Sequence, residues 1–485
     1  MNFETVIGLE VHAQLLTKSK MFCHCSADYA SAPPNTHVCP VCLGMPGVLP
    51  TINQQAIEYT VMTALALNCS IPGYTKFDRK NYPYPDLMKG YQISQYDAPL
   101  GKKGWLTIEV DDKKKKVGIT RVHLEEDVAK LVHRNLPGGG DYSLVDVNRS
   151  GVPLMEVVGE PDLSSPEEAR QYLIKLRSIM QYLGVSTGNM EEGSFRCDAN
   201  ISIRPEGNSE SLAKVEVKNM NSFRAVYRAL EYEAERQRKA ASEGKRLSQE
   251  TRGWVEDKGK TVAMRSKEYA HDYRYFPEPD LPPLTLSQDW VAAVRVKLPE
   301  LPDARRERFI TEYGLSAYDA GLLTSSKAMA DYFESVIKAG GELPAKNIAN
   351  WIIGPVSAII NTNNIDMAEF STKVSSEQLA RLVVLESQDT ISTATAKSVL
   401  EEMCRTGQSA DDIINKRGLS QISDSTALEA EVIAVINGNS KAVSDYKAGK
   451  TQSLKFLVGQ VMKATRGRAD PNVVIELLKQ KLEEG

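Results

Sequence analysis

Four of the seven cysteines form a compact group near the N-terminus, and cysteine thiolates are strong ligands for zinc. They occur as a Cys-x-Cys pair followed by a Cys-Pro-x-Cys pair, namely Cys23, Cys25, Cys39 and Cys42. Thiolates two or three positions apart can share one tetrahedral ion, and a second pair about a dozen residues away completes the ligand set. Four sulfurs leave no open coordination position, so we predict a structural zinc ion that stabilises the loop 23–42. The alternatives are a redox pair or a chance grouping. His24 and His37 could substitute for a cysteine ligand, but the set of four cysteines is complete without them.

Acidic residues and one imidazole recur in segments that we expect to form β-strands. Glu10 and His12 are two residues apart, so strand alternation puts both side chains on one face. Glu125 lies in a second such segment, and Glu156 interrupts an apolar run in a third, where a buried acid needs a partner. Carboxylates with one imidazole suit Mg²⁺, which prefers oxygen ligands and commonly also binds substrate phosphates. If the three segments do not meet, each acid is an ordinary surface or edge-strand residue.

The segment from Lys76 to Tyr96 interleaves cations, among them Lys80 and Lys89, with tyrosine rings. Cations and flat rings together can hold phosphates and stack an adenine or an unpaired base. The segment therefore suits either ATP or the 3′ end of a tRNA, although a loop anchored by its tyrosines is an equally good explanation. Similar mixtures of polar and aromatic residues occur at 196–200, 218–221 and 273–276.

The C-terminal region concentrates positive charge. Between residues 441 and 468 there are seven cations and one acid, a net charge of +6. A local excess of this size on an otherwise acidic chain indicates contact with a phosphate backbone, and a solvated helix face is the alternative. The candidate RNA-binding residues are Lys447, Lys450, Lys455, Lys463, Arg466 and Arg468, together with Lys441.

Overall composition excludes several classes of protein. The 485 residues carry 59 Lys and Arg against 63 Asp and Glu, a formal net charge of −4, so any RNA contact must be local. A chain with 42% hydrophobic and 25% charged residues is neither disordered nor fibrous. The longest mostly apolar run, 351–360, is far shorter than the roughly 20 residues that span a bilayer, and the N-terminus does not resemble a secretory signal. We therefore expect a cytoplasmic protein without membrane contact, whose cysteines serve a purpose other than disulfides.

Two further signals do not support chemistry of their own. The Gly449-Lys450-Thr451 sequence ends like a phosphate-binding loop, but Ser444 replaces the earlier glycine and the region is expected to be helical. The chain also has no Gly-x-Ser-x-Gly sequence and no cysteine motif typical of a glutamine amidotransferase.

The distribution of proline predicts the domain organisation. Twenty of the 23 prolines lie at or before Pro302, which separates a region rich in strands and loops from a helical one, with a boundary near residue 290. In the first region we expect a hairpin over 104–126, a helix capped by Ser165 that ends at Gly184, and a helix from Ser222 to about 242. These elements predict a mixed α/β domain built round an antiparallel sheet.

After residue 300, N-capping signals and helical periodicity recur without strand signals. A polar stretch near residues 405–408 suggests a second boundary, which leaves a small helical tail. The expected capping residues are Asp303, Ser325, Ser375, Ser409, Asp424, Ser440 and Asp470.

Taken together, these motifs resemble one protein family, the B subunits of bacterial-type GatCAB aspartyl/glutamyl-tRNA amidotransferases. The resemblance is essentially end to end and includes a tail similar to the family's YqeY-like domain, through residues 456–463 and 469–471. One departure is Met88, where the family has proline, and the archaeal E subunits carry an inserted domain for which this length leaves no room. The motifs are 8–12 (GLEVH), 39–44 (CPVCLG), 81–87 (NYPYPDL), 123–127 (HLEED), 148–153 (NRSGVP), 196–200 (RCDAN) and 273–280 (YRYFPEPD).

The resemblance implies an α+β fold with three domains: a kinase-like cradle over 1–290, a helical domain over 291–405 and a YqeY-like, tRNA-binding tail over 406–485. It implies that ATP phosphorylates the side-chain carboxylate of Glu or Asp misacylated on tRNA(Gln) or tRNA(Asn). Ammonia from glutamine, released in the partner A subunit (an amidase that acts as the glutaminase), then displaces the phosphate. The same complex contains a small C subunit as the second partner.

The resemblance also implies roles for individual residues. Glu10, His12, Glu125 and Glu156 would bind Mg²⁺, with Glu126 and Asp198 as reserve ligands. The residues expected to bind substrate or phosphate are Lys80, Lys89, Asp198 and Lys218. Two rival interpretations remain: a non-catalytic, zinc-stabilised scaffold that docks tRNA for its partners, and a metal-dependent hydrolase.

Overall fold

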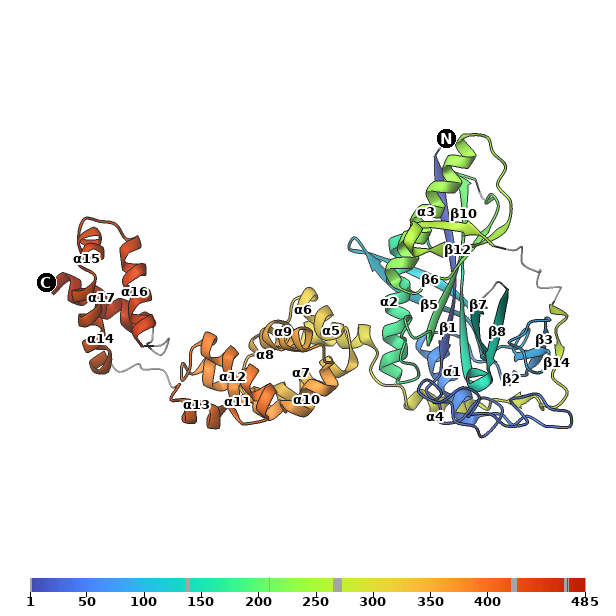
Figure 1. The fold of residues 1–485 in the computed structure, drawn as a ribbon, viewed down its shortest axis with the longest axis horizontal. Helices are drawn as coiled ribbons and strands as arrows, with labels where there is room; N and C mark the ends of the chain where they lie inside the picture. Colours follow the sequence, from blue (N-terminus) through green and yellow to red (C-terminus); the bar gives the residue numbers. More distant parts are fainter. Residues whose placement is uncertain are drawn as a thin grey trace. The chain divides into compact units, whose positions relative to one another are not determined.

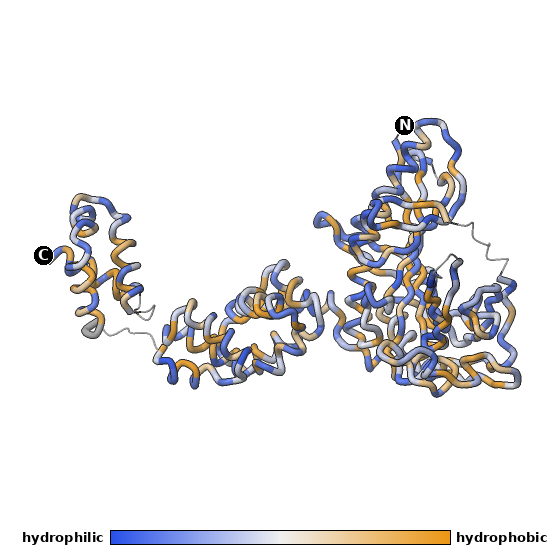
Figure 2. Tube along the Cα trace, in the orientation of Figure 1, coloured by the Kyte–Doolittle hydropathy of each residue, from blue (hydrophilic) through white to orange (hydrophobic). Residues whose placement is uncertain are grey.

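The computed structural model describes residues 2–135, 140–208, 210–264, 273–419, 425–465, 469 and 471–484 (Figure 1). The chain divides into two compact units, Met1–Pro302 and Asp303–Gly485. The first unit is built round a β-sheet, whereas the elements of the second are helices throughout its described part, so the predicted α+β class is confirmed. Figure 2 shows hydrophobic and hydrophilic residues interleaved along these helices. None of the described helices is long and apolar enough to cross a membrane.

An eight-stranded sheet forms the frame of the first unit, in the order β13-β12-β11-β10-β1-β9-β6-β5. Every neighbouring pair is antiparallel except β11 and β12, which run parallel. The strands are β1 (Phe3–Gln14), β5 (Gly101–Val110), β6 (Lys113–Glu126), β9 (Pro153–Gly159), β10 (Phe195–Pro205), β11 (Val215–Lys218), β12 (Glu250–Val255) and β13 (Lys260–Ala263).

Three helices pack on this sheet and share one hydrophobic core with its apolar residues. Helix α1 (Gln54–Ala66) packs on β6, α2 (Pro166–Leu183) on β5 and α3 (Phe223–Ser242) on β10. The side chains of Ser165 and Ser222 cap α2 and α3, and Gly184 ends α2 with φ 68°, as the sequence predicted. The core therefore lies on one face of the sheet, which leaves the other face for polar side chains.

Small sheets lie beside the large one. The three-stranded sheet β14-β3-β4 contains β3 (Asp78–Asn81), β4 (Tyr91–Ser94) and β14 (Phe276–Pro277). Two-stranded sheets are formed by β2 (Tyr74–Thr75) with β15 (Leu284–Thr285) and by β7 (Lys130–Asn135) with β8 (Asp141–Asp146). The buried carboxylate of Glu126 joins the three-stranded sheet to β6, because its Oε1 accepts from the backbone N–H of Ile93 at 2.9 Å.

The predicted hairpin is present as β5 and β6. Asp111 and Asp112 at its tip have φ values of 50° and 60°, the left-handed conformation that two-residue hairpin turns require. Farther along β5, a Cβ on Gly104 would lie 2.4 Å from Cys69 Sγ and from the carbonyl oxygen of Leu67. Glycine at this position is what allows the end of α1 to approach the strand.

The second unit contains two separate hydrophobic cores. The first extends from Phe309 to Ile414 and the second from Leu428 to Leu482. The helices around the first are α5 (Pro302–Tyr313), α6 (Ala317–Leu323), α7 (Lys327–Gly340), α8 (Ala345–Trp351), the π-helical turn η4 (Ile352–Val356), α9 (Ser357–Asn363), α10 (Met367–Lys373), α11 (Ser376–Ser387), α12 (Thr393–Thr406) and α13 (Ala410–Arg417). Those around the second are α14 (Ser425–Gly438), α15 (Ser440–Lys447), α16 (Gln452–Ala464) and α17 (Pro471–Glu484).

The hydrophobic core in which a helix packs shows to which domain that helix belongs. Helix α4 (Gln288–Val296) spans the boundary expected near residue 290, and Val294 packs in the core of the first unit while Lys297 Nζ pairs with Glu58 of α1 at 2.7 Å. Helix α13 lies beyond residue 405, yet Ile413 and Ile414 pack in the core that begins at Phe309. We therefore propose that the first unit extends to 302 and that the tail begins after 419.

Two of the predicted helix caps, Ser375 and Ser409, are confirmed. The other starts differ. Helix α5 begins with Pro302, so that Asp303 lies in its first turn rather than at its cap. Ser326 rather than Ser325 caps α7, and Asn439 rather than Ser440 precedes α15. Asp424 and Asp470 lie outside the described residues.

Gly104→Ala should destabilise the first unit by about 1–3 kcal/mol, because the added methyl overlaps a backbone carbonyl and a buried sulfur that cannot both move aside. Urea unfolding of the full chain, followed by tryptophan fluorescence, measures the effect. Gly73→Ala is the matched control, since its Cβ would have only one neighbour, the Leu286 carbonyl oxygen at 3.9 Å. Equal stability of the two variants would contradict the tight packing of α1 on β5.

Candidate functional site

The predicted acidic residues meet on the polar face of the large sheet. Strand β1 pairs with β9, and β9 pairs with β6, so that His12 lies opposite Glu156 and Glu156 lies opposite His123. Glu125 is two residues farther along β6 and shares the face of His123. The residues between them, such as Val11, point to the helical core and are fully buried. Strand alternation thus gives these segments one apolar face and one face that carries the candidate ligands.

The distances between these side chains are those of a metal-ligand group. His12 Nε2 lies 3.6 Å from Glu125 Oε1 and 3.4 Å from Glu156 Oε2. Ligand atoms of His12, Glu125 and Glu156 all lie within 4.8 Å of one another. His123 Nε2 approaches Glu156 Oε2 at 3.2 Å from the opposite strand. Two carboxylates and one imidazole form a donor set that fits Mg²⁺, which also accepts water or phosphate oxygens as further ligands.

The electrostatics of this group follow from the burial of Glu156, which is 7% exposed. Burial alone would raise the pKa of Glu156, but the neighbouring His123 and His12 outweigh it and hold that pKa well below its usual range. Burial would likewise lower the pKa of His12, but Glu156 and Glu125 outweigh it, and the pKa is raised. The Glu156 carboxylate therefore stays ionised.

Glu10, the fourth predicted ligand, lies in the same cavity but apart from this group. Its Oε1 accepts a hydrogen bond from Asn200 Nδ2 at 2.9 Å, and its neighbour on β10 is Asp198. Asp198 forms an ion pair with Lys218 of β11. These four side chains and His12 line a cavity of about 650 Å³.

Lys80 lies on the side of the cavity formed by β3. Burial would lower the pKa of Lys80, but the charges of Glu125 and other acidic groups outweigh it and raise that pKa. Its Nζ lies 5.1 Å from the ring centre of Tyr273 and 5.9 Å from that of Tyr82. The cavity thus combines carboxylates on the large sheet with a lysine on the small sheet and aromatic rings beside it, which is the combination that binds phosphates and a base.

Lys89 and Glu126 occupy a different position from the one we expected. Neither lines the cavity; Lys89 Nζ donates to Glu126 Oε2 at 2.7 Å. The reason is local, because Glu126 lies at the end of β6 and is taken up in joining β4 to the large sheet.

Sequence reasoning did not place Gln95, Glu216 or Thr251 at the cavity, which they line. The sequence could have indicated Glu216, because it is two residues from the predicted Lys218 on β11 and so shares its face. In the structure it lies opposite Asn200. Gln95 had no such signal, because contacts distant in sequence hold it at the site: its Oε1 accepts from the backbone N–H of Leu124 at 3.0 Å, and its Nε2 donates to Thr75 Oγ1 at 2.6 Å.

The four clustered cysteines also meet. Their four sulfur atoms, those of Cys23, Cys25, Cys39 and Cys42, all lie within 4.8 Å of one another, so the group could hold a metal ion. Cys42 Sγ accepts from the backbone N–H of Cys39 at 3.1 Å. A hydrogen bond from Cys23 is the largest of the effects that lower the pKa of Cys42 to about 4, and the charge on Lys20 is another. His24 and His37 are not part of this group.

In the tail, five of the predicted RNA-binding residues are described. Lys441 and Lys447 belong to α15, Lys455 and Lys463 belong to α16, and Lys450 pairs with Asp445 at 2.9 Å. Arg466 and Arg468 lie outside the described residues.

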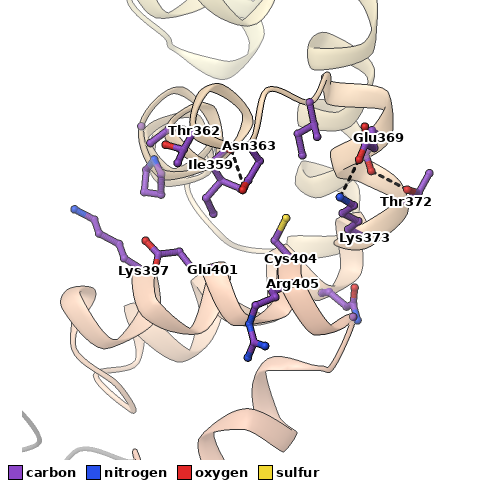
Figure 3. Close-up of a pocket in the computed structure, with 16 residues that line it drawn as sticks. Ile359, Thr362, Asn363, Glu369, Thr372, Lys373, Lys397, Glu401, Cys404 and Arg405 are labelled. Atoms are coloured by element: carbon purple, nitrogen blue, oxygen red, sulfur yellow. Dashed lines mark hydrogen bonds and ion pairs between the residues drawn. The ribbon is translucent and has the colours of Figure 1, made fainter.

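A larger cavity of about 1380 Å³ lies among the helices of the second unit and contains none of the predicted site residues (Figure 3). Glu369 and Lys373, which line it, pair with each other at 2.8 Å. Cys404 and Lys397 of α12 also line this cavity. Its charges are mixed, and no cluster of metal ligands occurs there among the described residues.

Comparison with known proteins identifies the family. The GatB/GatE catalytic domain matches residues 5–292, and the GatB domain of the YqeY type matches residues 331–482. A protein of Dehalococcoides mccartyi strain 195 is 64% identical over 100% of this chain and 99% of its own length. Proteins of Thermomicrobium roseum and Moorella thermoacetica are 58% and 56% identical, over at least 99% of each chain. All three are named as the B subunit of an aspartyl/glutamyl-tRNA(Asn/Gln) amidotransferase, and this chain therefore belongs to the GatB/GatE family.

Proposed function

We propose that this protein is the B subunit of a tRNA-dependent amidotransferase and carries its activating site. In the proposed reaction an oxygen of the side-chain carboxylate of Glu or Asp, esterified to tRNA, attacks the γ-phosphorus of ATP. ADP leaves, and the product is an acyl phosphate. Ammonia then attacks the acyl carbon and phosphate leaves, which gives Gln-tRNA(Gln) or Asn-tRNA(Asn). A carboxylate needs this activation because it has no good leaving group.

The single observation that supports this role best is the meeting of His12, Glu125 and Glu156 at a cavity. His12 and Glu156 line that cavity, as do Lys80 and Lys218. Phosphoryl transfer needs mainly positioning and neutralisation of charge. Mg²⁺ held by His12, Glu125 and Glu156, with Glu10 nearby, would neutralise phosphate charge and orient the substrates.

The cations and rings of the cavity have complementary roles in this proposal. Lys80 and Lys218 would contact phosphate oxygens, while the carboxylate of Asp198 positions Lys218. Tyr273 and Tyr82 flank Lys80 and provide flat surfaces for a base.

Arg196 lies opposite His12 on β10. Its Nη2 donates to the buried carboxylate of Asp127 at 2.7 Å, which holds the guanidinium in place beside the strand that carries His12.

Other features fit the same assembly. We propose that the four cysteines bind a structural zinc ion and that the lysines of the tail contact the tRNA backbone. The relatives' name designates the B member of a larger assembly. We propose that this assembly is cytoplasmic and that its other members are an A subunit, which supplies ammonia, and a small C subunit.

His12→Ala or Glu125→Ala should abolish tRNA-dependent ATP cleavage in the assembled complex, because each removes charge neutralisation worth several kcal/mol in the transition state. ADP release in the presence of Glu-tRNA is the measurement, and basal glutamine hydrolysis should persist. His133→Ala is the matched control, since His133 is exposed on β7 and its ring hydrogen-bonds only to Ser143 among the described residues. Normal conversion of Glu-tRNA to Gln-tRNA by a His12/Glu125 double variant would favour the docking-scaffold alternative.

Protein purified without chelator should contain about one zinc ion per chain, and Cys39→Ser should lose it and destabilise the first unit. Elemental analysis and thermal unfolding measure the two effects. Cys404→Ser, in the second unit, should keep its zinc. Four reactive thiols and no zinc in the native chain would refute the zinc assignment.

Removal of residues 420–485 should weaken tRNA binding and leave the core 309–414 complete. The triple variant Lys447→Ala/Lys455→Ala/Lys463→Ala should also bind more weakly, with a smaller dependence of affinity on salt, because it makes fewer phosphate contacts. Lys113→Ala/Lys114→Ala, at the tip of the β5–β6 hairpin, is the control and should bind normally. If only the hairpin variant binds weakly, the RNA contact belongs to the first unit instead.

A further inference from the structure

Lys20 is the most unusual cation of the first unit, because its side chain is 0% exposed. Lysine is almost never fully buried unless a partner compensates its charge. The contacts of its Nζ are the carbonyl oxygen of His37 at 2.8 Å, the carbonyl oxygen of Val147 at 3.4 Å and Cys42 Sγ at 3.7 Å. None of these three groups is a carboxylate, so the only partner among them that can carry a full negative charge is the sulfur.

The cysteine cluster, in contrast, would carry an excess of negative charge. A divalent ion with four thiolates leaves two uncompensated negative charges on the site. Cys23 and Cys42 are buried, so water cannot solvate all of that charge. The backbone N–H of Cys39 donates to Cys42, and Lys20 approaches the same sulfur. A hydrogen-bonded sulfur next to a buried ammonium is the arrangement that stabilises a thiolate.

We propose that Lys20 is the built-in countercharge of the cysteine cluster, a positioning residue that makes a four-thiolate metal site stable in a partly buried loop. The inference rests on the proposed zinc site and adds a residue that no cysteine motif reveals. Groups just outside a metal's ligands commonly change its affinity 10- to 100-fold.

The same side chain connects the cluster to the large sheet. Lys20 Nζ reaches Val147, and the Lys20 stem lies 3.5 Å from where a Cβ of Gly151 would be. The next residue, Met21, donates its backbone N–H to the Gly151 carbonyl oxygen at 2.6 Å. Strand β9, which carries Glu156, begins two residues later at Pro153. Lys20 therefore lies between the cysteine cluster and the turn that leads into the site.

The test measures zinc retention by the full-length chain during competition with a chromogenic chelator. Lys20→Met keeps the length of the stem and removes the charge, and it should weaken zinc binding 10- to 100-fold. Lys18→Met, two residues away on the exposed side of the same segment, should bind zinc like the native chain. Native protein without zinc would refute the zinc site itself, whereas native-like zinc retention by Lys20→Met would refute only the role of Lys20.

A second experiment uses a variant whose site carries one negative charge fewer. It distinguishes charge compensation by Lys20 from a role of Lys20 in packing. Cys25→His replaces a less buried thiolate by a neutral imidazole and lowers the negative charge of the site by one. Adding Lys20→Met to this variant should then cost at least threefold less zinc affinity than it does in the native chain. An equal cost in both backgrounds would show a packing role and overturn the proposal. If Lys20→Met alone fails to fold, recovery of folding in the Cys25→His background supports the proposal, and failure there refutes it.

Discussion

The interaction on which the site depends is the burial of one carboxylate, Glu156, in an interior strand between two histidines. An ionised acid at this depth would be strongly destabilising without partners, and His12 and His123 on the flanking strands supply them. This requires β9 to lie between β1 and β6, which are far apart in sequence. Three features are consistent with providing partners for the Glu156 carboxylate. They are the strand order, the separation of the sheet into an apolar and a polar face, and the position of Glu125.

Much of this arrangement was predictable, because it depends on local patterns. The alternation around Glu10 and His12 correctly assigned the faces of β1, and Ser165, Ser222 and Gly184 correctly marked the ends of α2 and α3. The spacing of the four cysteines predicted that their sulfurs would meet, as they do. In each case the side chains that decide the outcome are close in sequence, so propensity, capping chemistry and ligand spacing are sufficient.

The rest depends on contacts that no local pattern encodes. Lys89 belongs to the same basic and aromatic segment as Lys80, yet it pairs with Glu126, because β3 and β4 meet β6 with Glu126 at their junction. Tyr273 reaches the cavity because β14 pairs with β3, held by Arg79 Nε donating to Glu278 Oε2 at 2.7 Å across almost 200 residues. Helix α13 joins the core before it through Ile413 and Ile414, although a polar stretch precedes it. Such partners are selected by tertiary packing, which a single sequence does not display.

The first unit has two anionic groups, the acids of the cavity and the four clustered cysteines, and their negative charge is compensated in different ways. In the cavity the buried Glu125 and Glu156 are balanced by groups on separate strands, and the neighbouring Glu10, His12 and Asp198 are partly exposed, so an incoming cation or phosphate can reach the group. In the cysteine loop the sulfurs meet one another, and Lys20 is fully enclosed. The first arrangement suits chemistry, which must exchange ligands, and the second suits a permanent structure. Met21, which follows Lys20, donates its backbone N–H to Gly151, and Leu15, which follows β1, donates to Pro153, so the chain on both sides of Lys20 is joined to the start of β9, the strand that carries Glu156.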